Sequence, residues 1–220
     1  MRRELQAKSV RTPTCPLPAA VTPRDPDALP LSYLEAQRQY RQGRIEQALA
    51  TLAGIIRPTG RWAGSGGATA RRAAALLKAW CLIEKKDPTA ALEWLAIAGR
   101  LRHLATDDLT AKVITLNARL YEEDHVAIQA EATELLKVCP DPADLNHAEL
   151  RLILGASLRW QGHLEEAMGH VEFACSAFTI LDEPGRCAVA ANFLGWTCLS
   201  LGRLNESRRW FEKSLGINTR

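Results

Sequence analysis

The sequence predicts an all-α protein built from repeated helix pairs, and two observations carry that prediction: the aliphatic composition and an internal repeat. The 220 residues include 65 Ala and Leu but only 17 Val and Ile. Ala and Leu favour helices, whereas the β-branched aliphatic residues fit the pleated surface of a sheet better. The chain is long enough to bury a sizeable core. It contains no run of 18 apolar residues, so we expect no membrane-spanning segment.

The repeat is clearest near the carboxy terminus, where two segments align at an offset of 40 residues, LGASLRWQGHLEEAMGHVEFA from Leu154 and LGWTCLSLGRLNESRRWFEKS from Leu194. The early Gly of each copy allows a neighbouring helix to approach, and the Gly seven residues later gives permissive backbone at a helix end. A second helix with apolar residues at helical spacing follows. The matched positions are Leu154/Leu194, Gly155/Gly195, Gly162/Gly202, Leu164/Leu204, Glu166/Glu206 and Ala167/Ser207. One such pair cannot bury its own apolar faces, so stacked pairs must form the core of an α-solenoid.

Three weaker copies precede these two. YLEAQRQYRQGRIEQALATL has Ala36 at the small position and Gly43 at the turn. ALLKAWCLIEKKDPTAALEWLAIA keeps Ala79 but replaces the turn glycine with Asp87-Pro88, and Pro suits the first turn of a helix. VITLNARLYEEDHVAIQAEATELL is the most degenerate copy. We therefore expect a domain over 30–217 with about five antiparallel helix pairs, near 31–57, 69–101, 107–138, 144–181 and 185–216.

The first 29 residues differ in composition from the rest. The basic start MRRELQAKSV is not followed by an apolar stretch, so it does not predict a signal peptide. The segment carries Pro13, Pro16, Pro18, Pro23 and Pro26. We predict a disordered, Pro-rich leader at 1–29 and a cytoplasmic location.

The six cysteines form no C-x-x-C pair and no zinc-type spacing with His. Cys81, Cys175 and Cys198 lie in apolar helical stretches, where a free Cys behaves as a small hydrophobic residue. Buried, reduced thiols are therefore expected, as in a cytosolic protein. A disulfide between Cys175 and Cys187 is the leading alternative.

Charge argues against nucleic acid as a partner. The chain has 28 Lys and Arg against 25 Asp and Glu, and the two signs are interspersed. A protein that relies on phosphate contacts usually has a concentrated basic face. We expect no direct binding to nucleic acid.

No motif predicts catalysis, a cofactor or a metal site. The stretch GRWAGSGGATARR, 60–72, lacks the Lys and the preceding strand of a phosphate-binding loop, so we interpret it as a linker. Arg61, Arg71 and Arg72 could still form an anion site at the next helix start. His163, Glu166 and His170 share one helix face, but a metal needs three or four converging ligands, which favours an exposed polar face.

The pattern L-G-x6-G-x-L-x-E-A/S-x3-F/V-x2-A/S resembles the tetratricopeptide repeat (TPR). The 40-residue period is similar to the long variant in bacterial regulators of the maltose-activator and antibiotic-regulatory type, most of all in FTILDEPGRCAVAANFLGW. The resemblance implies a right-handed superhelix that binds a protein or peptide without catalysis. It also implies an adaptor or sensor in bacterial transcriptional or signalling control, acting through a partner, since this sequence shows no DNA-binding or ATPase part.

In TPR proteins the first helix of each pair lines a concave groove. The matching positions give a candidate groove with Trp at three places, which would make an exposed patch suited to a partner. Alternatively, the longer helices shift the register and these Trp pack between repeats. The candidates are Tyr33, Gln37, Tyr40, Arg41, Trp80, Glu84, Asn117, Tyr121, Arg159, Trp160, Asn192 and Trp196.

A second candidate surface lies at the carboxy terminus. TPR arrays usually end with a solvating helix, but here SLGINTR follows the second helix of the fifth pair directly. Four residues would then form an uncovered apolar face: Leu204, Trp210, Phe211 and Leu215. We expect this face to mediate a homodimer or to dock a partner. A structural assembly protein that uses this end rather than the groove is the alternative function.

Overall fold

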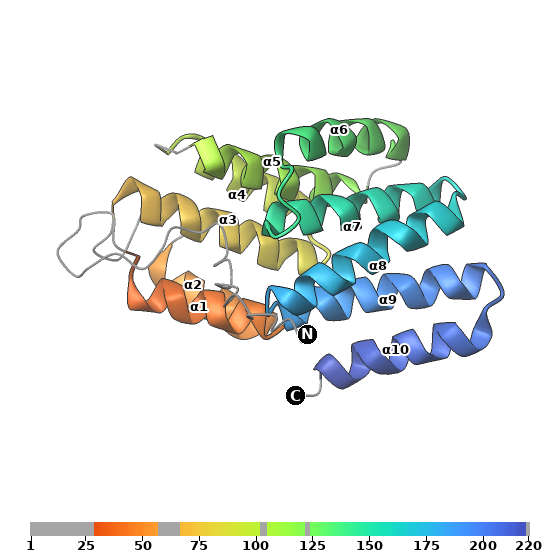
Figure 1. Cartoon of the computed structure of the whole chain (residues 1–220). Coiled ribbons are helices and arrows are strands. Elements are labelled where there is room, and N and C mark those ends of the chain that lie inside the picture. The colour runs from red at the N-terminus through yellow and green to blue at the C-terminus, as the bar shows by residue number, and fades with distance from the viewer. Residues whose placement is uncertain (1–28, 57–66, 102–104, 122–123, 219–220) are drawn as a thin grey trace, which may run out of the picture.

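The structure is a computed structural model that describes residues 29–56, 67–101, 105–121 and 124–218 (Figure 1). Within these ranges the chain forms ten α-helices, which confirms the all-α prediction. The helices are α1 (Leu31–Arg41), α2 (Ile45–Ile55), α3 (Ala68–Glu84), α4 (Pro88–Gly99), α5 (Ala105–Arg119), α6 (His125–Val138), α7 (Leu145–Trp160), α8 (Leu164–Ile180), α9 (Pro184–Ser200) and α10 (Leu204–Asn218). Residues 1–28 of the predicted leader at 1–29, and residues 57–66, which include the first part of the Gly-rich stretch, lie outside the described residues. Leu29, the last residue of that leader, is buried.

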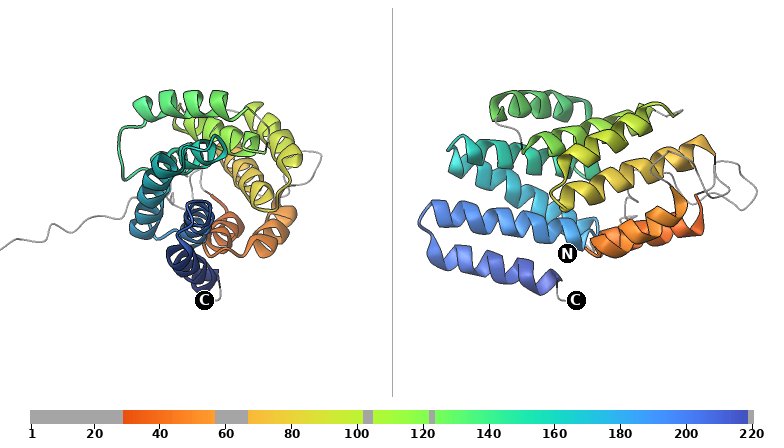
Figure 2. Two further views of the ribbon diagram at one scale, coloured as in Figure 1. Left: turned by 90° about the vertical axis from the view of Figure 1, so that its right-hand side faces the viewer. Right: turned by 180° about the vertical axis from the view of Figure 1, so that it is seen from behind.

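The helices stack as five antiparallel pairs in two layers. Each odd-numbered helix packs against the even-numbered helix that follows it, and it also contacts the next odd-numbered helix. The odd-numbered helices therefore form an inner layer, and the even-numbered ones cover it from outside (Figure 2). This is an α-solenoid with a TPR-like arrangement of helix pairs.

Local sequence signals set several helix starts. The carboxylate of Asp87 accepts a hydrogen bond from the backbone N–H of Ala90, and Asp124 and Asp144 cap α6 and α7 in the same manner. These side chains satisfy backbone donors that have no partner within the helix. Pro88 and Pro184 occupy the first helical positions of α4 and α9, where a missing N–H has no cost.

The glycine in the middle of α7 sets how closely that helix packs on α8. A Cβ atom on Gly155 would lie 2.3 Å from Cγ2 of Val171 and 2.9 Å from the backbone oxygen of Ala167. The equivalent atom on Gly195 would lie 2.5–2.9 Å from the ring of Phe211. A side chain at either position requires its neighbours to move, and a backbone atom moves less readily than the end of a side chain.

The turns inside the pairs contain one residue with left-handed backbone. Gly43, Gly162 and Gly202 have φ values of 74°, 86° and 74°. In the second pair the same place is taken by Lys86, with φ of 59°. The sequence interpretation was wrong here, because Lys86 and not Asp87-Pro88 replaces the turn glycine.

The superhelix brings its first pair into contact with its fifth. The end of α1 contacts α9, and Nε of Arg41 lies 2.6 Å from Oε1 of Glu183 in the α8–α9 turn. A Cβ atom on Gly185 would lie 3.2 Å from the backbone nitrogen of Gly43 and 3.3 Å from the backbone oxygen of Arg41. The inner layer thus closes on itself (Figure 2).

Cys81, Cys139, Cys175, Cys187 and Cys198 are buried free thiols. The disulfide considered between Cys175 and Cys187 is absent, although their sulfur atoms are only 3.6 Å apart. Within the described ranges, every helix is too short or too polar to span a lipid bilayer.

Candidate functional site: a cavity inside the superhelix

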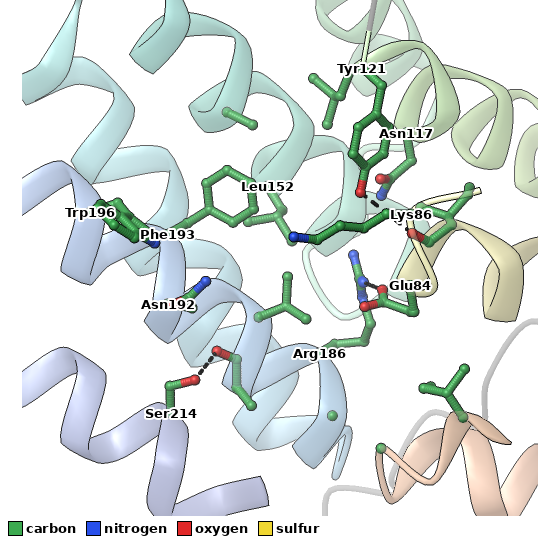
Figure 3. Close-up of a pocket in the computed structure, with 18 of the residues that line it drawn as sticks. Glu84, Lys86, Asn117, Tyr121, Leu152, Arg186, Asn192, Phe193, Trp196 and Ser214 are labelled. Carbon is green, nitrogen blue, oxygen red and sulfur yellow. Dashed lines mark hydrogen bonds and ion pairs between the residues drawn. The ribbon is translucent and has the colours of Figure 1, made fainter. Parts of the chain in front are cut away.

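The inner layer surrounds a cavity of about 820 Å³ (Figure 3). Its walls come mainly from the odd-numbered helices, which is the face that the TPR resemblance implies for binding. Gly43, Ile45 of α2, Lys86 of the α3–α4 turn and Ser214 of α10 complete it. Because α1 and α9 meet, the walls form a closed circuit and not an open groove.

Two indole rings form one side of the cavity. Trp160 is 62% exposed and stacks on the ring of His125, with centroids 5.6 Å apart. Trp196 is 48% exposed, and its ring meets the ring of Phe211 edge-on at 5.4 Å. Each indole is therefore held against a ring of its own chain while much of its surface remains available to a ligand.

A buried ion network joins three helices at the other side of the cavity. Arg186 of α9 donates to both carboxylate oxygens of Glu149 on α7 and to Glu84 on α3. Its guanidinium carbon also lies 5.1 Å from the ring centroid of Trp80. Figure 3 shows the Arg186 and Glu84 side chains facing each other. The network ties the second, fourth and fifth pairs together.

Burial and charge act in opposite directions in this network. Burial disfavours the charged form of Arg186, but the carboxylates of Glu149 and Glu84 outweigh it and raise the pKa of Arg186 well above its ordinary value. Burial raises the pKa of Glu149, against the attraction of Arg186. Burial likewise raises the pKa of Glu183 to about 7, although Arg41 opposes that rise. Burial also raises the pKa of Tyr40 well above its ordinary value, so its hydroxyl keeps its proton.

Two other cations line the cavity without a carboxylate partner among the described residues. Lys86 extends from the α3–α4 turn into the cavity (Figure 3). Arg159 contacts the ring of Trp160, at 5.4 Å from the ring centroid, and its buried Nε has no hydrogen-bond acceptor. Burial lowers the pKa of Arg159 because nothing compensates its charge. Among the described residues, positive charge therefore exceeds negative charge at this cavity.

Most of the groove candidates lie on the cavity wall. The sequence left open whether the tryptophans face a groove or pack between repeats. Trp160 and Trp196 face the cavity, whereas Trp80 packs between helix pairs against Arg186. The candidates that line the cavity are Tyr40, Glu84, Asn117, Tyr121, Arg159, Trp160, Asn192 and Trp196.

Four candidates do not line the cavity. Tyr33 is fully buried in the core of the first pair, and Trp80 is enclosed as described. Gln37 is partly exposed elsewhere on α1. Arg41 is used in the contact with Glu183. Near α1 the superhelix closes, so only the last residues of that helix reach the interior.

The carboxy-terminal face is less apolar than the sequence suggests. Leu204 and Leu215 are exposed, but Phe211 packs on Gly195 and Trp196, and Trp210 packs against the core of the last two pairs. Two of the four residues expected on this apolar face therefore pack inside the protein, because the aromatic residues of α10 face α9.

The remaining sequence candidates have other environments. No group of three or more His, Cys, Asp or Glu in the described residues is placed to hold a metal ion, so His163, Glu166 and His170 do not converge. Arg72 is buried and donates to the backbone oxygen of Ala98 at 2.6 Å and to Asp108 at 3.2 Å. It is a structural residue and not part of an exposed anion site.

Sequence reasoning missed three residues that shape the cavity: Lys86, Phe193 and Arg186. Lys86 could have been predicted as the turn residue from its spacing. It follows Ala79 by seven residues, and Gly162 follows Gly155 by the same number. Arg186 left no such signal, because its partners come from α3 and α7, far away in the sequence.

The comparisons with known proteins give distant structural similarity only. No protein-family model matches the chain, and no curated protein matches it. The solved structure of MamA MSR-1 aligns at 14% identity and a TM-score of 0.41, over 86% of this chain and 95% of that one. Two crystal forms of MamA AMB-1 align at 16% and 15% identity, with TM-scores of 0.42 and 0.40. They cover 86% and 84% of this chain and 99% and 96% of those chains.

Proposed function

We propose that the chain is a non-catalytic protein-binding module that holds a short acidic segment of a partner protein in the cavity. The observation that carries the proposal is Lys86, which occupies the position of a turn glycine, extends into the cavity and has no carboxylate partner in the part of the chain that the structure describes. A non-Gly residue in left-handed backbone costs about 1 kcal/mol. Glycine at this position, as in three other pairs, would avoid that cost but would remove the cation.

The charge balance of the cavity supports an anionic ligand. Arg186 is neutralised by Glu84 and Glu149, whereas no carboxylate among the described residues pairs with Lys86 or Arg159. A charge held in a partly dry site is stabilised when an opposite charge and hydrogen-bond acceptors are brought to it. A carboxylate side chain of a partner supplies both.

The neutral side chains of the wall suit a peptide. Exposed indoles are typical anchors for the apolar side chains of a partner. The amide groups of Asn117 and Asn192 can donate to and accept from an extended backbone. The volume lies within the range of roughly 300–1,000 Å³ that is usual for small-ligand sites, so the cavity holds a few residues and not a folded domain.

A direct test uses matched peptide pools and the full chain. One pool contains hexapeptides with two fixed Glu and one fixed Leu, and the other has Lys in place of Glu; both carry an uncharged fluorophore. Fluorescence anisotropy should show binding of the acidic pool at least tenfold tighter. The double variant Lys86→Gln/Arg159→Gln should lose about tenfold in affinity, and Trp160→Ala/Trp196→Ala should also weaken binding.

The matched control is Arg208→Gln, which removes an exposed cation on α10 that is paired with Glu212. Its affinity should equal that of the parent chain. Equal affinity for both pools, or no loss in either double variant, would refute the proposal. Tight binding of a small free anion such as citrate, without binding of acidic peptides, would also refute it.

The wider role is part of the same proposal. A module that recognises an acidic segment is suited to act as an adaptor or sensor, and the resemblance to long-repeat regulators favours transcriptional or signalling control in a bacterial cytoplasm. Copurification from a lysate, compared between the parent chain and the tryptophan double variant, identifies the partner on which that role depends.

The alternative is self-association through α10. Exposed Leu204 and Leu215 favour it, whereas Arg208 and Glu212, charged and exposed on the same helix, oppose it. Light scattering at tens of micromolar distinguishes the two cases. A dimer that Leu204→Asp/Leu215→Asp converts to a monomer would support this alternative, and a monomeric parent chain would exclude it.

A further inference from the structure

Two thiols from different helices face each other beside the α8–α9 turn. Cys175 lies near the end of α8 and Cys187 near the start of α9, and their sulfur atoms are 3.6 Å apart. The two residues are only 2% and 5% exposed. The proposed binding function makes no use of them.

Polar groups surround this thiol pair. Nζ of Lys213, from α10, lies 3.5 Å from the sulfur of Cys175. Oγ1 of Thr179 lies 3.4 Å from the sulfur of Cys187. The hydroxyl group of Thr179 also donates to the backbone oxygen of Cys175 at 2.9 Å. The ammonium group of Lys213 is therefore the group that most directly favours loss of one proton from the pair.

The ionisation of the pair differs from that of the other described cysteines. The hydrogen bond shared by the two sulfurs, helped by Thr179 and Lys213, outweighs burial and lowers the pKa of Cys187 to about 6. The same hydrogen bond and burial raise the pKa of Cys175, which keeps its proton. By contrast, burial raises the pKa of Cys81 to about 12 and of Cys139 to about 11, and it also raises the pKa of Cys198.

We propose that Cys175 and Cys187 are a peroxide-reactive thiol pair that closes to a disulfide. The Cys187 thiolate attacks one oxygen of a hydroperoxide and breaks the O–O bond, which gives a sulfenic acid and releases hydroxide or an alkoxide. The sulfur of Cys175 then attacks the sulfenic sulfur, and its proton leaves with the displaced hydroxide as water. Overall, two thiols are oxidised by two electrons and the peroxide is reduced to water, or to water and an alcohol.

The geometry places the second sulfur where it can complete the reaction. A disulfide requires the sulfur atoms to approach to about 2.05 Å, from a separation that is already a contact distance. The bond would link α8 to α9 across the turn that carries Glu183. It would also lie directly next to Arg186, so oxidation would fix the segment that closes the superhelix.

Differential alkylation of the full chain tests this inference. The reduced protein is treated with hydrogen peroxide, quenched and alkylated with N-ethylmaleimide. Intact mass should show that the number of alkylated thiols falls by two, and peptide mapping should find Cys175 linked to Cys187. Cys81→Ser, a matched loss of another buried thiol, should leave this link unchanged, whereas Cys175→Ser should abolish it.

Lys213 provides a test that does not remove a thiol. A rise of one unit in the pKa of Cys187 would reduce its thiolate fraction at pH 6 about fivefold. Lys213→Gln should therefore slow disulfide formation about fivefold at pH 6, and Lys213→Arg should retain the parent rate. The inference is overturned if peroxide leaves both thiols open to alkylation, if another pair is linked instead, or if Lys213→Gln reacts at the parent rate.

Discussion

The second helix pair and the last two pairs share a backbone design but differ at two positions. In α7–α8 and α9–α10 the inner helix carries Gly155 or Gly195, and the turn carries Gly162 or Gly202. In α3–α4 the corresponding residues are Ala79 and Lys86. The turn keeps its left-handed conformation in every case.

This difference shows that glycine is needed at the two positions for two different reasons. At the inner-helix position the reason is space, because a Cβ on Gly155 would meet the backbone of α8. At the turn position the reason is conformation alone, since a Cβ on Gly162 or Gly202 would meet nothing within 4 Å. A side chain is therefore tolerated at the turn for a modest cost, and in the second pair it extends into the cavity.

The largest expected effect arises where the two regions meet. Arg186→Leu removes the cation that pairs Glu84 of the second pair with Glu149 of the fourth. A buried carboxylate without its partner should lower the free energy of unfolding by about 3–5 kcal/mol, measured by urea denaturation. Arg208→Leu, which breaks an exposed pair, should change it by less than about 0.5 kcal/mol. Equal effects of the two substitutions would contradict this account of the network.

Two matched substitutions test whether lack of space requires a glycine on the inner helix. Gly155→Ala should lower the free energy of unfolding by about 2–3 kcal/mol, because backbone of α8 must move. Gly195→Ala meets only the ring of Phe211, which can turn aside, so the loss should be nearer about 1 kcal/mol. Thermal denaturation in parallel would show whether the order holds, and a larger loss at Gly195 would reverse the argument.

The junction between the first and fifth pairs should respond to pH. The pKa of Glu183 is about 7 in the folded state, against an ordinary value of 4.5. The folded chain therefore keeps a proton that the unfolded chain releases, and stability should fall by roughly 2 kcal/mol as pH rises from about 4.5 to 7. Burial of Glu149 acts in the same direction.

The midpoints of urea denaturation at pH 5 and pH 8 measure this loss of stability with rising pH. Glu183→Gln should reduce it and leave the remainder due to Glu149. If the variant and the parent chain lose the same stability between these pH values, Glu183 does not carry the effect.

The smallest expected effect concerns the turn itself. Lys86→Gly should raise the free energy of unfolding by about 0.5–1 kcal/mol, because the left-handed residue then has no Cβ. The converse change, Gly162→Lys, should lower it by about 1 kcal/mol. If Lys86→Gly also weakens binding of the acidic peptide pool, then the lysine increases affinity for the ligand while it lowers the stability of the fold. If Lys86→Gly instead lowers the free energy of unfolding, the lysine side chain stabilises the fold, which would contradict this prediction.

The sequence predicted the helices well because their signals are local. Glycine at the turns, Pro88 at a helix start and apolar spacing each act within a few residues, so the helix class could be predicted from them. The TPR resemblance suggested Trp160, Trp196 and Asn192 as groove residues, and all three line the cavity. Tyr33 was misplaced, because it packs into the core formed by the first helix pair and α3 and does not face the cavity.

The cavity chemistry was less accessible to sequence reasoning. Arg186 and Glu84 are 102 residues apart, and Arg41 and Glu183 are 142 apart. Such pairs depend on the curvature accumulated over all the intervening helices. Phe211 shows the same limit at the carboxy terminus, where its packing against Gly195 removes it from the surface that the sequence pattern suggested.

The contact of Gly185 with Gly43 and Arg41 limits how this protein can evolve. Open solenoids lengthen or shorten by duplication or loss of a repeat, since each unit touches only its neighbours. Here the first and fifth units also touch, and a side chain on Gly185 would require the backbone of Arg41 and Gly43 to shift. Inserting or deleting one helix pair between α1 and α9 would separate Arg41 from Glu183, so closure sets how many pairs lie between the two contacting units.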